Sequence, residues 1–512
     1  MRRSLLLATL VVGAWGTPAV ADVDPAAAGG SIYLKGERTG AGTVRARVLG
    51  DVSVSGQEAA CVGCHQRSGL GTFEGPAAAP PVAARFLFSA RTSGGRARKG
   101  YTPELLARAL REGIDPEGRP LDPLMPRYDL SEGEVGSLAA YLSGLSAHPS
   151  PGVDDRAFHL ATVVTPDADP AVRERTVAVL KAFAEVRSHR TRNQGRMGKR
   201  RSDNAFREWD LKVWALTGPP EGWGAQLEAF YDRQPVFALL SGAGGRDWSP
   251  VHKFCERHRI PSILPNLDVP PDEAGSGFYN LYFSRGVLLE ADAIAASVAA
   301  SEGRRVVQVI GGGAAAAAGR SLALALSKRG VTVTREAPDT LPHADLSGAT
   351  DVVLWLSRPE LKAVRGDLPR LVPTARVYLS SHLLGPDEVP ELPAPIAAHA
   401  VVARPFCLPD EVTARYRRVG LWLGSLRLPG GDRRIDDQTY TACQVLGEAI
   451  SDAGFEYQRD YVLEMMDHEG GLEQISSFYP RLSFGPEARI LARGCYLVPL
   501  GAEAGAPRWL VP

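Results

Sequence analysis

The feature that most constrains the fold is an alternation of short apolar runs with amphipathic stretches along the larger, C-terminal part of the chain. The apolar runs include HLATVV from His159, VFALL from Val236, VVQVI from Val306 and VVLWL from Val352. Amphipathic segments such as 171–186 and 320–329 lie between them. Short apolar runs separated by helical segments are typical of parallel strands with crossover helices. We therefore predict an α/β fold with helix-covered parallel sheets over 156–512.

A separate unit is expected ahead of this region. The chain has 512 residues, which favours two or three domains at roughly 100–200 residues each. Ser131-Glu-Gly-Glu134 forms a capping-box pattern ahead of apolar residues at helical spacing, and Thr102-Pro103 predicts the start of an earlier helix. Proline and glycine follow the later helix, so we place the first unit at 31–145 and a linker at 146–155.

The N-terminus has the pattern of a secretory signal peptide. Arg2 and Arg3 precede the apolar segment 5–14, and Ala19-Val-Ala21 matches a cleavage site. A membrane anchor is the alternative, but the apolar run is shorter than the roughly 20 residues of a spanning helix, as is every later one. We expect residues 1–21 to be removed, leaving a periplasmic protein without a transmembrane segment.

Charge gives no reason to expect a nucleic-acid or membrane partner. Lys plus Arg and Asp plus Glu both number 58, so the formal net charge is zero. One local exception runs from Arg187 to Arg207, where eight basic residues accompany one acid, Asp203. This run is either a solvated loop or a docking surface for an acidic redox partner.

The pentapeptide CVGCH, Cys61 to His65, has the spacing for covalent haem attachment. Its two thiols can add to the haem vinyl groups, and the adjacent imidazole of His65 can bind the iron. A redox CxxC or half of a zinc site are the alternatives, but neither uses His65, and the sequence contains no second CxxC. We predict one haem c, attached through Cys61 and Cys64.

A second axial ligand is expected from Met125. It lies between Pro123 and Pro126 just ahead of the last helix of the first unit, whereas the rival, His148, lies in the predicted linker. Thioether ligation raises the potential of a haem. The alternative is that Met125 fills the core.

Four further cysteines are left unassigned. They allow three disulfide pairings, and buried free thiols are the alternative. These residues are Cys255, Cys407, Cys443 and Cys495.

Several segments of the first unit together resemble a class I cytochrome c domain. They are CVGCHQRSGLG, Glu74-Gly-Pro76, Pro80-Pro81, LMPRY and the closing helix 131–145. The resemblance implies an all-α fold. It also implies that the carbonyl of Pro80 or Pro81 supports the ligand histidine.

The region 156–512 is similar to type 1 periplasmic binding proteins of the branched-chain amino-acid receptor kind. The similarity rests on segments starting at Pro235, Arg259, Tyr279, Arg305 and Asp437. It implies two Rossmann-like lobes around a ligand cleft, with contacts expected from Ser241, Asn266, Asp268 and Ser381.

The resemblance also bears on the ligand. Where these receptors have a tyrosine, this chain has 314–318, all alanine, and where they have an acid for the ligand ammonium, it has Tyr378-Leu-Ser-Ser-His382. We therefore expect a ligand other than leucine, isoleucine or valine.

A glycine pattern within the same region also partly matches a dinucleotide fingerprint. Gly311-x-Gly313-x-x-Ala316 follows an apolar run, and Glu336 ends the next one. Because the second lobe of the binding-protein fold has a strand, turn and helix here in any case, we favour that interpretation.

Taken together, these patterns predict a periplasmic electron-transfer protein and not an enzyme. A one-haem cytochrome is joined to a domain that binds a small molecule or a partner, and redox partner proteins are expected in the periplasm. A haem with two protein ligands leaves no open iron site for a substrate. Two alternatives stay open: a solute-binding receptor of an ABC-type uptake or sensing system with an accessory haem, and an electron-accepting subunit of a periplasmic dehydrogenase.

Overall fold

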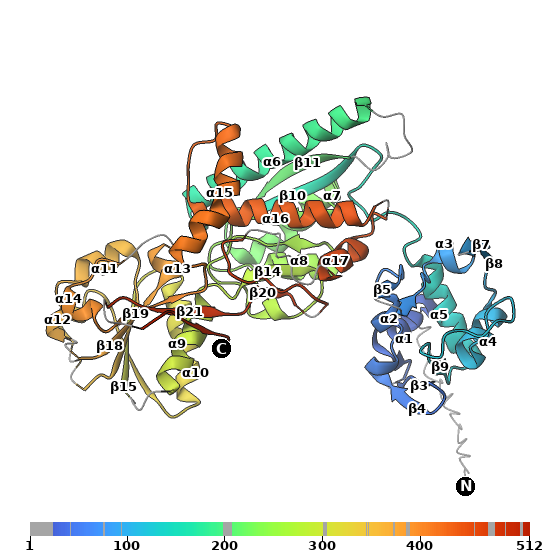
Figure 1. Cartoon of the computed structure of the whole chain (residues 1–512), viewed down its shortest axis with the longest axis horizontal. Coiled ribbons are helices and arrows are strands. Elements are labelled where there is room, and N and C mark those ends of the chain that lie inside the picture. Colours follow the sequence, from blue (N-terminus) through green and yellow to red (C-terminus); the bar gives the residue numbers. More distant parts are fainter. Residues whose placement is uncertain are drawn as a thin grey trace, which may run out of the picture. The chain divides into compact units, whose positions relative to one another are not determined.

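The computed structural model describes residues 24–512, except for 41, 75–76, 94, 198–206, 301–304, 345, 347, 372–373, 386–389, 455, 469–476, 487 and 502–504. The predicted signal peptide lies outside the described residues. The chain divides into an N-terminal unit that ends at Ala147 and a C-terminal unit that spans His148–Pro512 (Figure 1).

The described part of the N-terminal unit begins with a helix that starts before residue 31, where the unit was expected to start, and its two predicted helices begin where the sequence indicated. In chain order the helices of this unit are α1 (Pro25–Lys35), α2 (Val62–His65), α3 (Ala84–Leu87), α4 (Pro103–Glu112) and α5 (Glu132–Gly144). The predicted capping box is present, since the Ser131 hydroxyl accepts from the Glu134 amide and the Glu134 carboxylate accepts from the Ser131 amide. Helix α1 packs on α5, and a Cβ at Gly29 would lie 2.0 Å from the Ser137 carbonyl oxygen, so this crossing requires glycine.

The expectation of an all-α unit is wrong, because short antiparallel strands occupy much of this unit. A three-stranded sheet joins β4 (Val52–Ser55), β3 (Arg45–Val48) and β9 (Arg127–Tyr128). Two-stranded pairs are formed by β1 (Glu37–Arg38) with β2 (Gly42–Thr43), β5 (Thr72–Glu74) with β6 (Ala77–Ala79), and β7 (Arg91–Ser93) with β8 (Arg96–Arg98). In β3 Ala46 is buried between exposed Arg45 and Arg47, which is the two-residue period of a half-buried strand.

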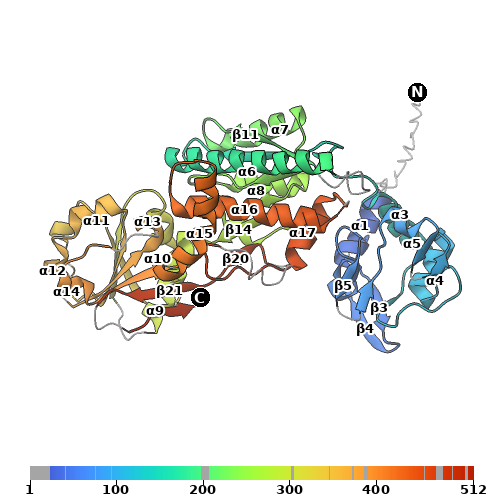
Figure 2. The ribbon, with the colours of Figure 1, turned by 45° about the horizontal axis from the view of Figure 1, so that its top comes forward.

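The first lobe of the C-terminal unit is built on a parallel sheet. In sheet order its strands are β11 (Glu208–Ala215), β10 (Ala157–Val164), β12 (Ala238–Leu240), β13 (Ser262–Ile263), β14 (Asn280–Ser284) and β20 (Ile490–Ala492). Its helices are α6 (Pro170–Met197), α7 (Trp223–Arg233), α8 (Ser249–His258), α15 (Pro409–Ser425), α16 (Arg433–Asp452) and α17 (Arg459–His468). Helices α6 and α16 run side by side across this lobe (Figure 2).

The second lobe repeats the same strand order. Its sheet follows β16 (Thr332–Glu336), β15 (Arg305–Ile310), β17 (Asp351–Trp355), β18 (Arg376–Ser380), β19 (Ala400–Arg404), β21 (Cys495–Pro499) and β22 (Arg508–Leu510). Strand β21 pairs antiparallel with both β19 and β22, and the other pairings are parallel. Its helices are α9 (Val287–Ala299), α10 (Ala315–Ser327), α11 (Arg358–Val364), α12 (Leu368–Leu371), α13 (Ser381–Leu384) and α14 (Ala394–Ala397). The predicted two-lobed α/β architecture is confirmed.

Three short connections join the lobes. They run from β14 to α9 through 285–286, from β19 to α15 through 405–408, and from β20 to β21 through 493–494. Glycine is required at Gly286, which has φ 58° and where a Cβ would lie 2.1 Å from the Asp268 carbonyl oxygen.

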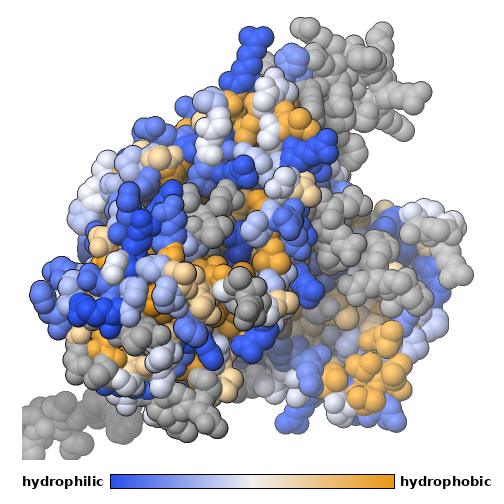
Figure 3. All heavy atoms as spheres, turned by 60° about the vertical axis from the view of Figure 1, so that its left-hand side comes forward, coloured by the Kyte–Doolittle hydropathy of each residue, from blue (hydrophilic) through white to orange (hydrophobic). Residues whose placement is uncertain are grey.

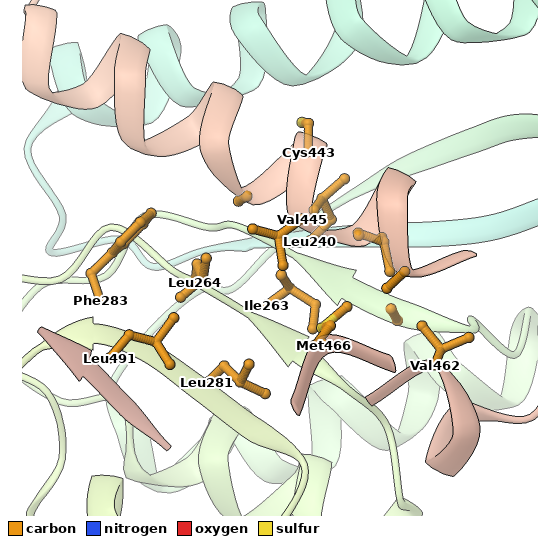
Figure 4. Packing of buried hydrophobic residues seen from close by; sticks show 14 of the residues in the cluster. Leu240, Ile263, Leu264, Leu281, Phe283, Cys443, Val445, Val462, Met466 and Leu491 are labelled. Carbon is orange, nitrogen blue, oxygen red and sulfur yellow. The ribbon is translucent and has the colours of Figure 1, made fainter. Parts of the chain in front are cut away.

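The core of the first lobe lies between its sheet and helices α16 and α17. Leu240, Ile263 and Leu281 from the strands pack against Val445 of α16 and Met466 of α17 (Figure 4). All five side chains are buried, as expected for strands covered by helices.

On the face drawn in Figure 3, hydrophilic and apolar residues are interspersed. Within the part of the chain that the structure describes, no helix combines the length and the apolar character needed to span a membrane.

Candidate functional site

Three charged or titratable side chains from both lobes meet between the sheets. Asp268 follows β13 in the first lobe, His382 lies in α13 directly after β18 in the second lobe, and Arg434 lies in the first turn of α16. The Nε2 atom of His382 is 2.9 Å from Asp268 Oδ1, and Arg434 Nη1 donates to the same oxygen at 3.3 Å. We call Asp268, His382 and Arg434 the interlobe triad.

The triad leaves one carboxylate oxygen open. The side chain of His382 is 1% exposed and that of Arg434 10%, whereas that of Asp268 is 52% exposed. Both partners contact Oδ1, and Oδ2 accepts no hydrogen bond from the described residues. The backbone of Asp268 is held in place because its carbonyl accepts from the Val287 amide at 3.0 Å.

Electrostatics fix the charge states of the triad. Burial and the positive charge of Arg434 lower the pKa of His382, so this imidazole is neutral near pH 7. Burial raises the pKa of Asp268, but the His382 hydrogen bond and the Arg434 charge outweigh it and hold that pKa below its usual range. Arg434 Nη1 also lies 3.1 Å from His382 Nε2, but an ionised Asp268 can only accept, so Nε2 carries the proton and donates to Asp268 Oδ1. The buried Nδ1 is then without a partner among the described residues.

A buried carboxylate holds the loop that carries His382. The Glu290 side chain of α9 accepts hydrogen bonds from the Ser380 hydroxyl, from the Ser381 hydroxyl at 2.9 Å and from the His382 amide at 3.0 Å. Burial raises the pKa of Glu290 to about 8, although these hydrogen bonds lower it. Glu290 therefore holds the backbone of His382 in place through the hydrogen bonds of the 380–382 loop.

The other predicted cleft residues mainly bind one another. The Asn266 amide nitrogen donates to the hydroxyls of Thr176, Ser241 and Thr439 at 3.0, 3.3 and 3.0 Å, and all four residues are buried in the first lobe. Ser381 is engaged by Glu290. Of the residues expected in the cleft, only Asp268 joins the triad.

Arg434 was not among the predicted site residues. A signal for its position exists in the sequence, because Asp432 caps the helix that carries it, accepting from the amides of Arg434 and Ile435. The cap indicates where the helix begins, but not what that end of the helix faces.

The glycine loop after β15 is occupied by a carboxylate of the same lobe. Glu360 of α11 accepts from the Gly312 amide at 3.0 Å and from the Ser357 amide at 2.8 Å. An internal anion therefore uses a backbone donor that a dinucleotide phosphate would need, which favours the binding-protein interpretation of this loop.

In the N-terminal unit His65 is buried and one of its ring nitrogens is hydrogen-bonded. His65 ends α2 and is 7% exposed, and its Nδ1 lies 2.9 Å from the Pro80 carbonyl oxygen. Of the two prolines expected to contact this histidine, Pro80 makes the hydrogen bond. Because a carbonyl only accepts, Nδ1 carries the proton and Nε2 keeps a free electron pair. Burial lowers the pKa of His65, which favours the neutral imidazole.

The remaining haem candidates differ in burial. Cys61 is buried, Cys64 is exposed, and Met125 packs half-buried against the hydrophobic cluster that contains Cys61. His148 belongs to the C-terminal unit, where its carbonyl accepts from Gln458 at 2.6 Å. Cys61, Cys64, His65 and Met125 all belong to the N-terminal unit and are the residues that would hold the predicted haem.

All six described cysteines are free thiols, including Cys255, Cys407, Cys443 and Cys495, which are buried. No cluster of three or more His, Cys, Asp or Glu side chains in the described ranges is arranged to hold a metal ion.

Most of the basic run between Arg187 and Arg207 has no described side chains. Its two ends bind internally, Arg187 to the Gly447 carbonyl and Arg207 to the Asp154 carbonyl. The predicted docking surface therefore lies largely outside the described residues.

No family model and no curated protein matches the chain. Among solved structures it is similar to a leucine-binding protein from Thermotoga maritima, with 11% identity over 69% of this chain and 98% of that one and a TM-score of 0.46. It is also similar to an isoleucine complex of a branched-chain amino acid transporter substrate-binding protein from Streptococcus pneumoniae, with 9% identity, 70% and 100% coverage and a TM-score of 0.47. A fatty acid ABC transporter substrate-binding protein from Thermomonospora curvata gives 13% identity, 68% and 90% coverage and a TM-score of 0.45. We base the function on the chain's own residues.

Proposed function

We propose that this protein is exported to the periplasm and binds a small polar solute between the two lobes of its C-terminal unit. The observation that carries the proposal is the interlobe triad, in which a half-exposed carboxylate of one lobe is held by partners from both lobes. In α/β sheets, ligands bind outside the carboxyl ends of the strands, and Asp268 and His382 both follow such ends.

Closure of the lobes provides the mechanism of capture. A solute that contacts Asp268 in one lobe and the His382 loop in the other binds more tightly when the lobes are closed. This difference in affinity shifts the population from the open form of the lobes to the closed form.

Solute release from the purified full-length protein tests the proposal. Mild denaturation followed by mass spectrometry should identify a small molecule that rebinds with one-to-one stoichiometry. At a concentration of 100 times its Kd, it should stabilise the C-terminal unit by about 2.7 kcal/mol. Release of no solute, together with no thermal shift in fractionated periplasmic extract, would contradict solute binding.

We propose electron transfer through one haem c as the second function, carried by the N-terminal unit. Its support is the CVGCH motif together with the His65 to Pro80 hydrogen bond. When bound, the haem supplies one-electron cycling between the ferrous and ferric states. Cys61 and Cys64 would attach it, and His65 and Met125 would hold the iron, with a periplasmic redox protein as partner.

A pyridine haemochrome spectrum and a haem-stained denaturing gel test this second function. We expect a c-type spectrum and a peroxidase-active band. Extraction of the haem into acid acetone would contradict covalent attachment.

A further inference from the structure

The open oxygen of Asp268 determines which kind of ligand group can bind beside the triad. A carboxylate oxygen that is ionised and exposed can only accept hydrogen bonds, so it favours a donor and repels an anion. His382 and Arg434 both contact Oδ1 and leave Oδ2 free for a ligand.

The triad pairs one carboxylate with one guanidinium. The charges of Arg434, Asp268 and Asp432 all act on His382. Because His382 and Arg434 contact Asp268 through Oδ1, a positive ligand group at Oδ2 adds a partner to this carboxylate without displacing either of them.

Several polar groups of the predicted cleft loops are engaged internally. The Asn266 amide donates to the hydroxyls of Ser241 and Thr439, and the Gly312 amide donates to Glu360. The Nη atoms of Arg434 lie against Asp268 Oδ1, and its Nε is buried without a partner among the described residues. Because Asp268 is far more exposed than Arg434, an anion that approaches this pair is repelled by the ionised Asp268 carboxylate.

We infer that the cleft binds an organic cation, a small molecule with an ammonium or amidinium group that hydrogen-bonds to Asp268 Oδ2 and with no need for a carboxylate of its own. This inference rests on the proposed solute binding and names its substrate class.

Calorimetric titration of the haem-loaded, full-length protein tests the inference with four probes. The first two are cations: 1,4-diaminobutane has two ammonium groups, and agmatine has an ammonium and a guanidinium group. The other two are leucine, which is a zwitterion, and succinate, which has two carboxylates. We expect at least one of the first two to bind, and leucine and succinate not to bind.

Two substitutions test the role of Asp268. Asp268→Asn should weaken amine binding at least about 30-fold, because it removes the charge partner of the ligand. Asp268→Glu, which keeps the charge, should bind more tightly than the asparagine variant. The matched control is Asp232→Asn on α7, an exposed aspartate of the first lobe, which should bind as the wild type does.

Each outcome decides the inference. Unchanged amine affinity in Asp268→Asn, with a wild-type melting curve, overturns it. Binding of leucine or succinate without amine binding overturns it as well, while solute binding itself stands. Failure of all four probes, in a protein from which no solute can be released, overturns both proposals.

Discussion

The two units carry their functional residues in opposite ways. In the N-terminal unit Cys61, Cys64 and His65 lie within five consecutive residues, whereas the interlobe triad joins residues that are 114 and 166 positions apart in the chain. The first arrangement depends on local sequence and a small core. The second exists only when two lobes have folded and met, so the units should respond differently to the same kind of change.

The largest difference is expected when the haem is lost. Cys61→Ser combined with Cys64→Ser should abolish attachment and leave the N-terminal unit unfolded, because the haem forms much of so small a core. Tryptophan fluorescence reports the other unit alone, since every tryptophan except Trp15 lies beyond His148. We expect its unfolding transition to keep its midpoint.

A native N-terminal unit in the double serine variant would show that its core does not need haem. A lowered midpoint for the tryptophan transition would instead show that the units fold together.

Met125→Ala should change the haem without detaching it. The oxidised wild type should show a weak sulfur-to-iron absorption band at the red edge, and the variant should lose it. The potential should fall by on the order of 0.1 V, because thioether ligation raises it. His148→Ala is the matched control and should keep both, whereas an unchanged spectrum in Met125→Ala would remove that residue from the iron.

Arg459→Met should destabilise the C-terminal unit by about 3–5 kcal/mol, the cost of leaving buried polar partners unpaired. The Arg459 guanidinium is buried and donates to the carbonyls of Phe237, His258, Arg259, Pro151 and Val236 and to the Tyr231 hydroxyl. Urea unfolding followed by tryptophan fluorescence measures the loss. Arg417→Met on the exposed face of α15 is the control, with an expected change within about 0.5 kcal/mol. A similar loss in both variants would contradict the assigned role.

The last comparison concerns pH. Glu290 has a pKa of about 8 in the folded protein against an ordinary value of 4.5, so between these values the folded state binds more protons than the unfolded state. Its contribution to stability is complete below pH 4.5 and falls as pH rises to 8, by up to about 1.4 kcal/mol per pH unit. Glu290→Gln should reduce this slope in urea unfolding between pH 5 and 8.

Asp437 serves as a comparison for the pH experiment. Burial raises the pKa of Asp437 to about 7, so Asp437 also makes the free energy of unfolding fall as pH rises. Glu290→Gln keeps this contribution. An identical slope in wild type and Glu290→Gln would show that Glu290 is not the group that titrates.

The sequence predicted best what depends on near neighbours. The apolar runs from His159 and Val306 gave the strands correctly, and Ser131 and Glu134 marked the start of α5. The hairpins of the N-terminal unit were missed because their strands are as short as two to four residues, which is too few for a periodic pattern to stand out.

The cleft was predicted only in part because its contacts are not local. Asp268 was expected at the site, but its pairing with Arg434 depends on where α16 packs, which no short motif encodes. Asn266 and Ser381 have the right chemistry for a ligand and lie on the expected loops, yet Thr439 and Glu290 supply their partners from distant segments.

Because three short connections join the lobes, a weak contact between the lobes is enough to hold them together. Two separate proteins would need a large interface to stay together, whereas lobes joined through 285–286, 405–408 and 493–494 meet at a high effective concentration. Under the proposed closure, a contact as small as the hydrogen bond between His382 of the second lobe and Asp268 Oδ1 of the first is enough to favour the closed form. A ligand needs to supply only the small additional free energy that distinguishes the closed form from the open one.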